Sequence, residues 1–239
     1  MRTLHHVPHH PPSRLVRLAL AEKRLPVELR SVPIWERPED FLILNPAGEV
    51  PVLRDREPLA NEAHLAGAPG AQPPKLLTLC GASVIVEYLE EAYPQINLMG
   101  RTLAQKAETR RLVDWFMRLF DRDVTSALVG EKIDKRLSRQ SVDSTAIRRG
   151  YKNLKFHLDY LGWLAETRSW LGGHDLSLAD FAAAAQISTL DYLGEINWHQ
   201  VPAVRDWYSR IKSRPCFRGL LSDRVPGRQP PAHYADLDF

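Results

Sequence analysis

The sequence predicts an α/β domain of four strands, followed by an all-helical domain and a C-terminal tail. Three observations support this division. Strand-like and helical segments follow one another as β-α-β and then β-β-α over residues 1–94, with an insertion at 55–75. Residues 102–221 show only helical periodicity. Residues 222–239 form a tail that contains three prolines and two aromatic residues.

The composition is typical of a globular protein, with 44% hydrophobic and 26% charged residues among 239. The formal net charge of +3 comes from 32 basic and 29 acidic residues that are interspersed, so no concentrated basic face indicates nucleic acid. There is no signal-peptide core, and no apolar run is long enough to span a bilayer. Cys80 and Cys216 imply no disulfide framework. We therefore expect a cytoplasmic protein with neither nucleic-acid nor membrane partners.

The elements of the first domain have clear start and stop signals. Residues 2–7 predict a strand, and Pro11-Pro12-Ser13 predicts the start of a helix in which Ser13 can cap. Pro26 ends that helix, and residues 27–32 predict a second strand, parallel to the first. A strand that begins at Pro51, a strand at 76–79 and an amphipathic helix at 82–93 complete the domain.

Residues 55–75 interrupt what should be a tight hairpin between the last two strands. This segment, DREPLANEAHLAGAPGAQPPK, is rich in Ala, Gly and Pro. Because the entropy of loop closure grows slowly with loop length, we expect a tolerated surface insertion rather than a binding element.

The helical domain is predicted from three apolar patterns. One stripe comprises Leu112, Trp115, Phe116, Leu119, Phe120 and Val124. A second helix, at about 143–166, should turn Ile147, Tyr151, Leu154, Leu158 and Leu161 inward. Ser177 and Asp180 form a capping box ahead of an Ala-rich buried helix at 181–193, and Pro202 opens a last helix at 203–213. We expect Asp180→Ala to cost about 1–2 kcal/mol through loss of the cap.

The stretch Asn45-Pro46-Ala47-Gly48-Glu49-Val50-Pro51-Val52-Leu53 closely resembles the N-P-x-G-x-V-P-x-L signature of glutathione S-transferases. The resemblance covers residues 2–221. It implies a thioredoxin-like N-terminal domain, an all-helical C-terminal domain and a cis Val50-Pro51 bond at the head of the third strand. In that family, the backbone beside the cis-proline faces a peptide-like ligand. The expected remnant of this ligand groove comprises Val50, Pro51, Gly81 and Ala82.

The family's chemistry is largely missing at the positions that match its motifs. Gly81 and Ala82 stand where the E-S-x-x-I-x-x-Y-L pattern places an acidic residue and a serine, whereas Ile85, Tyr88 and Leu89 match. His10 occupies the position of the catalytic Ser, Tyr or Cys, and Ser13 is the nearest hydroxyl. Each lost hydrogen bond to a charged group removes about 1.5–3 kcal/mol. We therefore expect no cofactor and no catalytic residue, with a glutathione-dependent transferase or isomerase using His10 or Ser13 as the alternative.

The histidines near the N-terminus do not predict a metal site. His5 and His6 are adjacent on a predicted strand, so their side chains point to opposite faces. No cysteine lies near them in sequence. We expect no metal, and we expect Cys80 and Cys216 to be inert because neither belongs to a C-x-x-C pair.

The tail has the features of a docking segment. Pro226, Pro230 and Pro231 stiffen it, and Tyr234, Leu237 and Phe239 stand among acidic residues. Such anchors suit either a partner or the tail's own domain. We expect that removal of 234–239 leaves the fold intact. A basic stretch, which is either a solvated face or an attractor of an acidic partner, comprises Lys132, Lys135, Arg136, Arg139, Arg148, Arg149 and Lys152.

Residues 223–239 and 32–37 also resemble the FzlA family of alphaproteobacterial cell-division proteins. Members of that family bind the tubulin-like GTPase FtsZ and promote curved filament bundles and constriction. The resemblance implies a non-catalytic FtsZ-filament regulator at the division site, acting as a homodimer. The alternative to both binder and enzyme is a dimerisation module in another complex. The expected partner-binding residues are Trp35, Arg148, Arg149, Tyr234, Asp236, Leu237, Asp238 and Phe239.

Overall fold

The computed structural model describes residues 2–56 and 75–237. Its mixed sheet has the order β2-β1-β3-β4 and is formed by β1 (Thr3–His6), β2 (Glu28–Ser31), β3 (Val52–Arg56) and β4 (Leu76–Cys80). β1 pairs in parallel with β2 and antiparallel with β3, which pairs antiparallel with β4. The predicted thioredoxin-like arrangement is confirmed.

The predicted insertion begins two residues too early. Asp55 pairs with Leu77 and Arg56 with Leu76, so these first residues of the 55–75 segment extend the hairpin. Residues 57–74 lie outside the described part of the chain, and the prediction of a surface loop there stays a prediction.

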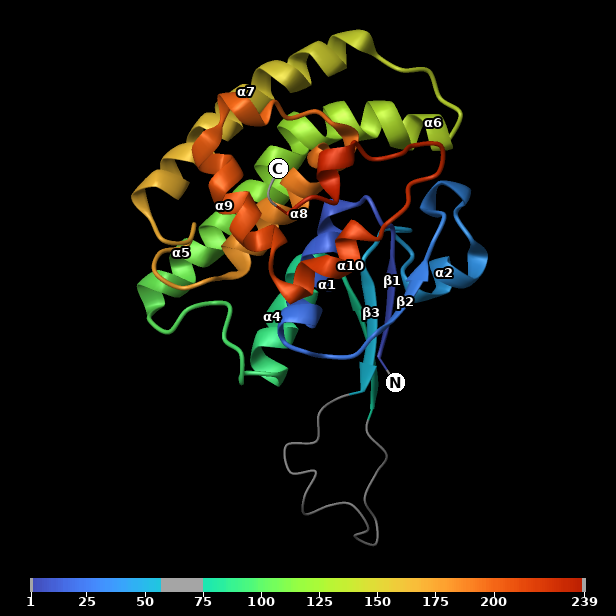
Figure 1. The fold of residues 1–239 in the computed structure, drawn as a ribbon. Coiled ribbons are helices and arrows are strands. Elements are labelled where there is room, and N and C mark those ends of the chain that lie inside the picture. The colour runs from blue at the N-terminus through green and yellow to red at the C-terminus, as the bar shows by residue number, and fades with distance from the viewer. Residues whose placement is uncertain (1, 57–74, 238–239) are drawn as a thin grey trace, which may run out of the picture.

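Helices cover both faces of the sheet. α1 (Pro11–Glu22) and α4 (Ala82–Ala92) lie on one face and α2 (Glu39–Leu44) on the other (Figure 1). A short turn, η1 (Ile34–Glu36), precedes α2, and the sequence analysis predicted neither of them. Phe41 of α2 packs into a small core with four valines of the strands and loops: Val7, Val32, Val50 and Val52.

α8 (Leu178–Leu193) is the centre of the helical domain, and all its residues except Leu193 are buried. Around it lie α5 (Leu103–Asp114), its π-helical continuation η2 (Trp115–Asp134), the short turn α6 (Lys135–Leu137) and α7 (Ser144–Thr167). The capping box that precedes α8 is present: Ser177 N–H donates to Asp180 Oδ2 at 3.0 Å.

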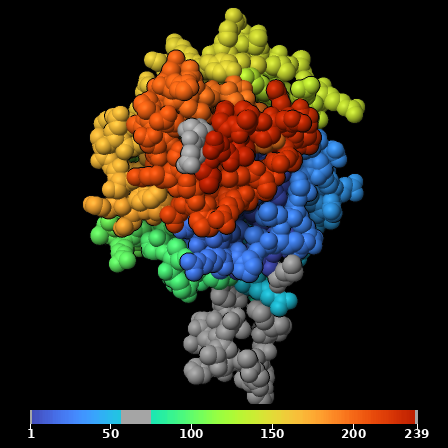
Figure 2. All heavy atoms as spheres, in the orientation of Figure 1, coloured from blue at the N-terminus to red at the C-terminus, as the bar shows by residue number. Residues whose placement is uncertain are grey.

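The C-terminal elements are η3 (Trp198–Gln200), α9 (Pro202–Lys212), η4 (Pro215–Phe217), α10 (Arg218–Leu221) and η5 (Ala232–Tyr234). Figure 1 shows the tail in red, leaving α10 and returning across the helical domain. In the space-filling view it covers the surface of the orange C-terminal helices and borders the blue N-terminal domain (Figure 2). The tail therefore folds back onto its own chain.

Two local predictions were wrong. Tyr151 does not face inward: it is 43% exposed, because the adjacent Gly150 instead approaches η2 closely. The predicted Leu154, Leu158 and Leu161 are buried. Ser13 does not cap α1, since the N-cap residue is His10 and Ser13 lies in the first turn. Among the helices of the described residues, none combines the length and hydropathy that a membrane crossing requires.

Candidate functional site

The peptide bond between Val50 and Pro51 is cis, as predicted. Pro51 has no N–H to donate, and it lies immediately before β3 rather than within the strand. The Pro51 carbonyl oxygen accepts a hydrogen bond from the Gly81 N–H at 3.0 Å. This bond ties the head of β3 to the start of α4, where the family's ligand anchors would lie.

A cleft of about 600 Å³ lies between the two domains beside this junction. Three of the four predicted groove residues, Val50, Gly81 and Ala82, line it. Pro51 is buried behind them. Residues of the sequence motifs therefore lie at this cleft, whereas its helical-domain side, which comes from α5 and η2, had no motif to reveal it.

His10 lines the cleft, and Ser13 does not. Burial is the main cause that lowers the pKa of His10 to about 4, so its imidazole is neutral at pH 7. Its Nδ1 atom is buried and has no hydrogen-bond partner among the described residues. Ser13 is fully buried, and its hydroxyl oxygen accepts the Val7 N–H at 3.4 Å. Of the two candidate catalytic positions, only His10 can meet a ligand in this cleft.

The start of α4 lacks the polar side chains that would hold a glutathione carboxylate and ammonium. Gly81 has φ +90°, a conformation that side-chain-bearing residues rarely adopt, and a Cβ atom there would meet nothing within 4 Å. Ala82 has no polar atom beyond its backbone. Ser83, which the sequence analysis did not single out, also lines the cleft. An acidic side chain at position 81 would therefore have space, but the positive φ of this residue favours glycine.

The two cysteines are poor nucleophiles. Burial raises the pKa of the Cys80 thiol, and burial is also the main cause that raises the pKa of Cys216 to about 12. Both remain protonated at neutral pH. Across residues 2–56 and 75–237, no group of three His, Cys, Asp or Glu side chains is arranged to hold a metal ion.

Tyr234 is a core residue of this chain. It is fully buried, its ring stacks edge-on against Tyr192 with centroids 5.1 Å apart, and its hydroxyl donates to the Leu220 carbonyl at 3.0 Å. Burial of this kind excludes Tyr234 from a partner surface. It also overturns the expectation that removal of 234–239 leaves the fold intact, because the cut would open the core.

Residues 235–237, which follow Tyr234, lie at the surface. Asp236 is exposed, and Leu237 is 40% exposed at a depression of about 500 Å³ beside Trp170 and Arg210. Burial lowers the pKa of Lys212, while the carboxylates of Asp191 and Asp236 act in the opposite direction. The charge near Asp236 is thus Lys212 of α9. Asp238 and Phe239 fall outside the described residues.

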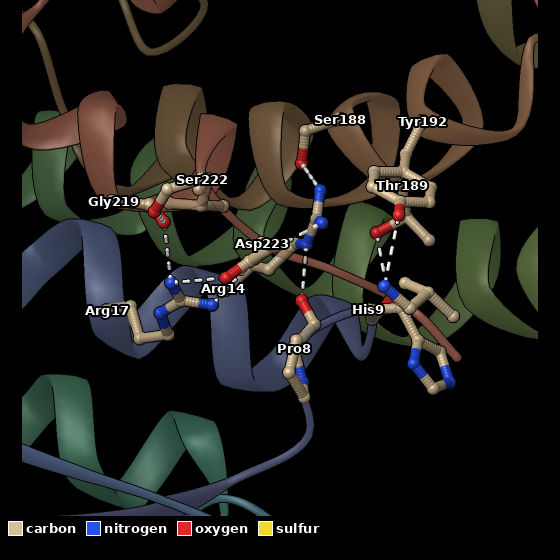
Figure 3. Close-up of polar contacts among 12 residues, drawn as sticks. Pro8, His9, Arg14, Arg17, Ser188, Thr189, Tyr192, Gly219, Ser222 and Asp223 are labelled. Carbon is tan, nitrogen blue, oxygen red and sulfur yellow. Dashed lines mark hydrogen bonds and ion pairs between the residues drawn. The ribbon is translucent and has the colours of Figure 1, made fainter. Parts of the chain in front are cut away.

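An ion-pair cluster joins the tail to the N-terminal domain (Figure 3). Asp223 accepts two hydrogen bonds of 2.8 Å from Arg17 and one of 3.4 Å from Arg14. The Arg14 guanidinium, whose side chain is fully buried, also donates to Ser188 of α8 at 2.8 Å and to the Pro8 carbonyl at 2.7 Å. We call Arg14, Arg17 and Asp223 the domain clamp. Sequence reasoning missed it, because Asp223 is more than 200 residues away from both arginines.

Two of the seven residues of the predicted basic stretch form ion pairs within the chain. Lys132 pairs with Glu195 at 2.6 Å, and Lys135 pairs with Glu131 at 2.7 Å. The exposed basic side chains are Arg136, Arg139, Arg148, Arg149 and Lys152. Trp35 is partly exposed in η1, next to Ile34, which lines the cleft.

Models of two known domains match the chain: the glutathione S-transferase N-terminal domain at residues 4–97 and the C-terminal domain at 140–215. FtsZ-localized protein A of Caulobacter vibrioides is 46% identical over 239 residues, covering 100% of this chain and 98% of the relative. Glutathione S-transferase GstB of Escherichia coli is 28% identical over 76% of this chain and 77% of its own length.

Solved structures agree with this. FzlA from C. crescentus has a TM-score of 0.90 at 46% identity, covering 100% of this chain and 99% of its own. A structure from Rhodospirillum rubrum described as a glutathione S-transferase has a TM-score of 0.88 at 46% identity, with full coverage of both chains. The chain therefore belongs to the glutathione S-transferase family, within which it is similar along its whole length to FtsZ-localized protein A.

Proposed function

We propose that this protein binds FtsZ filaments at the division site and regulates their architecture and cell constriction, without catalysing glutathione transfer. The single observation that supports this most is the 46% identity to FtsZ-localized protein A over the full length, tail included. A relative that shared only the scaffold would match over the two domains and diverge in the terminal segment.

The state of the ancestral groove supports a non-catalytic role. Gly81 and Ala82 supply no side-chain anchor, and His10 is a neutral imidazole with a pKa of about 4. At pH 7 it offers no positive charge to pair with a thiolate. The competing function is glutathione-dependent transferase or isomerase activity, favoured by the equally similar R. rubrum structure that is described as a transferase.

The proposed partner surface consists of the exposed end of the tail, the exposed arginines near the start of α7 and the partly exposed Trp35 of η1. Asp236 and Leu237 are exposed at the tail, and Asp238 and Phe239 complete the sequence there. The same tail packs beside the end of α8: Pro231 Cγ lies 3.8 Å from the position that a Cβ atom on Gly194 would occupy. The neighbouring Glu195 pairs with Lys132 of η2, on the side of the basic stretch. We assign Trp35, Arg148 and Arg149 to the same surface.

FtsZ co-sedimentation tests the proposal. Wild-type protein should pellet with FtsZ polymers, and deletion of 236–239 should abolish pelleting without opening the core, since it spares Tyr234. Asp236→Ala and Leu237→Ala should each weaken binding, with a cost of about 2 kcal/mol, or roughly 30-fold in Kd, at an interface anchor. Arg148→Glu should also weaken binding, whereas the matched control Arg101→Glu, an exposed charge change in the loop before α5, should leave binding unchanged.

Calorimetry with glutathione separates the binder from the enzyme. We expect no heat of binding at sub-millimolar concentration. A Kd below about 100 μM, roughly −5.5 kcal/mol, would favour the transferase. Absence of both glutathione and FtsZ binding would instead support a dimerisation module.

We also propose that the protein is a two-fold homodimer, since closed two-fold pairs are the commonest assemblies and the family fold offers faces of both domains. Light scattering at tens of micromolar should give twice the chain mass of 27.2 kDa. A monomer mass under these conditions would refute the dimer while leaving the FtsZ proposal intact.

A further inference from the structure

The interdomain cleft has an apolar interior that suits the body of a small organic molecule. Its wall includes Val50 and Val86 from the N-terminal domain, Met99 from the segment between α4 and α5, and Val113 and Met117 from the helical domain. A volume of about 600 Å³ is within the range of small-molecule sites. Two of the apolar residues are methionines, whose flexible side chains adapt to irregular ligands.

The two arginines that line this cleft are already committed. Arg110 donates to both oxygens of Glu87, at 2.8 and 3.0 Å. Arg118 donates to both oxygens of Asp114, at 2.9 and 2.7 Å. In each arginine, the pair of N–H groups that would bind a carboxylate bidentately already binds a carboxylate of the chain. The part of the lining that the structure describes therefore offers no unpaired cation to an anionic ligand.

Two further carboxylates of the lining, Glu49 and Asp121, form no ion pair with any described residue. Asp121 receives only two long hydrogen bonds, each of 3.5 Å, from Ser126 and Gln186. Burial is the main cause that raises the pKa of Asp121, and the two hydrogen bonds act in the opposite direction. Glu49 is exposed at the edge of the cleft. Counted with Glu87 and Asp114, four carboxylates face two guanidinium groups, so the cleft is acidic.

His10 adds an unsatisfied acceptor or donor near Asp121. Its Nδ1 atom is buried without a partner among the described residues. His10 and Asp121 both line this cleft. A bound N–H donor would satisfy Asp121 and, in the appropriate tautomer, His10 as well.

We propose that this cleft binds a small organic cation with an apolar body, an alkyl- or arylammonium, whose ammonium group pairs with Asp121 while its apolar part packs on the valines and methionines. Glutathione carries two carboxylates and one ammonium group, so the same electrostatics disfavour it. The proposal goes beyond FtsZ binding and does not depend on it, because none of the cleft residues that it uses belongs to the proposed partner surface.

Three compounds that share a phenyl ring and a two-carbon spacer test the charge preference on the full chain: phenethylamine, 2-phenylethanol and 3-phenylpropionate. By titration calorimetry or NMR at pH 7, phenethylamine should bind about tenfold or more tighter than 2-phenylethanol, and 3-phenylpropionate should bind weakest. Equal binding of the amine and the alcohol, tighter binding of the anion, or no binding of the amine at millimolar concentration would each overturn the proposal.

Asp121→Asn keeps the side-chain shape and removes the charge. It should weaken phenethylamine at least fivefold and leave 2-phenylethanol unchanged, whereas the control Asp159→Asn, on the exposed face of α7, should change neither. An unchanged amine affinity in Asp121→Asn would refute the assignment. If that variant does not fold, Glu49→Gln at the exposed edge provides the same comparison, and a loss of amine selectivity is again the expected result. FtsZ co-sedimentation should be the same with and without the amine, so the two proposals can fail separately.

Discussion

Removal of the Asp223 carboxylate should be among the most destabilising single changes in this protein. Asp223→Ala deletes the three hydrogen bonds that Arg14 and Arg17 donate and leaves two guanidinium groups without their counter-ion. Side-chain exposure is 0% for Arg14 and 6% for Arg17, so water cannot replace the carboxylate. Breaking a buried pair by removing one partner costs about 3–5 kcal/mol.

The clamp joins elements that hold the two domains and the tail together. Arg17 also donates to the Gly219 carbonyl at 3.0 Å, and Arg14 also donates to the Tyr234 hydroxyl at 3.3 Å. These bonds remain in Asp223→Ala and should keep the backbone close to its native path. The loss of stability therefore comes from the uncompensated charges, and its size is at the upper end of what single mutations cause.

Urea unfolding followed by fluorescence measures the effect. For a chain of this size, 3–5 kcal/mol corresponds to a fall of roughly 6–20 °C in melting temperature. Asp206→Ala is the control: Asp206 pairs with Arg205, but its side chain is 73% exposed, so the change should stay within about 0.5 kcal/mol. A loss below about 1 kcal/mol for Asp223→Ala would show that the clamp is solvated and that the burial argument is wrong.

Three further predictions concern stability. Asp180→Ala should cost about 3–5 kcal/mol, above the 1–2 expected of a cap, because the buried carboxylate also accepts from Leu171 N–H at 2.8 Å and Trp207 Nε1–H at 3.1 Å; urea titration checks this. Burial is the main cause that lowers the pKa of His6 from 6.5 to about 4, so the stability that neutral His6 supports is present above pH 6.5 and is lost as pH falls. The free energy of unfolding should fall by about 2 kcal/mol between pH 7 and pH 5 for this reason. His6→Asn should reduce this pH dependence, whereas the surface control His199→Asn should not. Gly150→Ala should destabilise by about 1–3 kcal/mol, since its Cβ would lie 2.9 Å from Ala127, whereas Gly162→Ala, with 3.7 Å to Val204, should stabilise by up to about 1 kcal/mol; equal melting temperatures would refute the steric argument.

Local sequence signals predicted the elements whose causes are local. The cis Val50-Pro51 bond, the Ser177 and Asp180 capping box and the helix after Gly81 each follow from neighbouring residues. Tyr151 shows where such signals fail. Its helical spacing matches Leu154 and Leu158, but only the depth of packing at Gly150 decides which of two adjacent positions turns inward.

The tail shows a different limit. Its sequence is equally compatible with a docking segment and with a segment folded on its own domain, because an aromatic anchor can be buried by either surface. The deciding group is Arg14, a buried cation near the start of the chain that needs the Tyr234 hydroxyl and the Asp223 carboxylate from its end. No pattern within a short window connects residues so distant.

The tail divides at Tyr234 into a part that contacts buried charges and a part that is exposed. Up to Tyr234 it supplies the carboxylate, the phenol and the carbonyl groups that satisfy buried cations, including the His233 carbonyl that accepts from Lys212 at 2.9 Å. Changes there should affect folding first, since each leaves a buried charge without compensation. Asp236 and Leu237 are exposed, although the Asp236 carboxylate also acts on Lys212, so we expect changes there to affect partner binding more than folding. A scan along the tail should therefore show stability losses at 223 and 234 and binding losses at 236 and 237. Binding losses confined to variants that also lower the melting temperature would mean that the tail acts only by holding the two domains together.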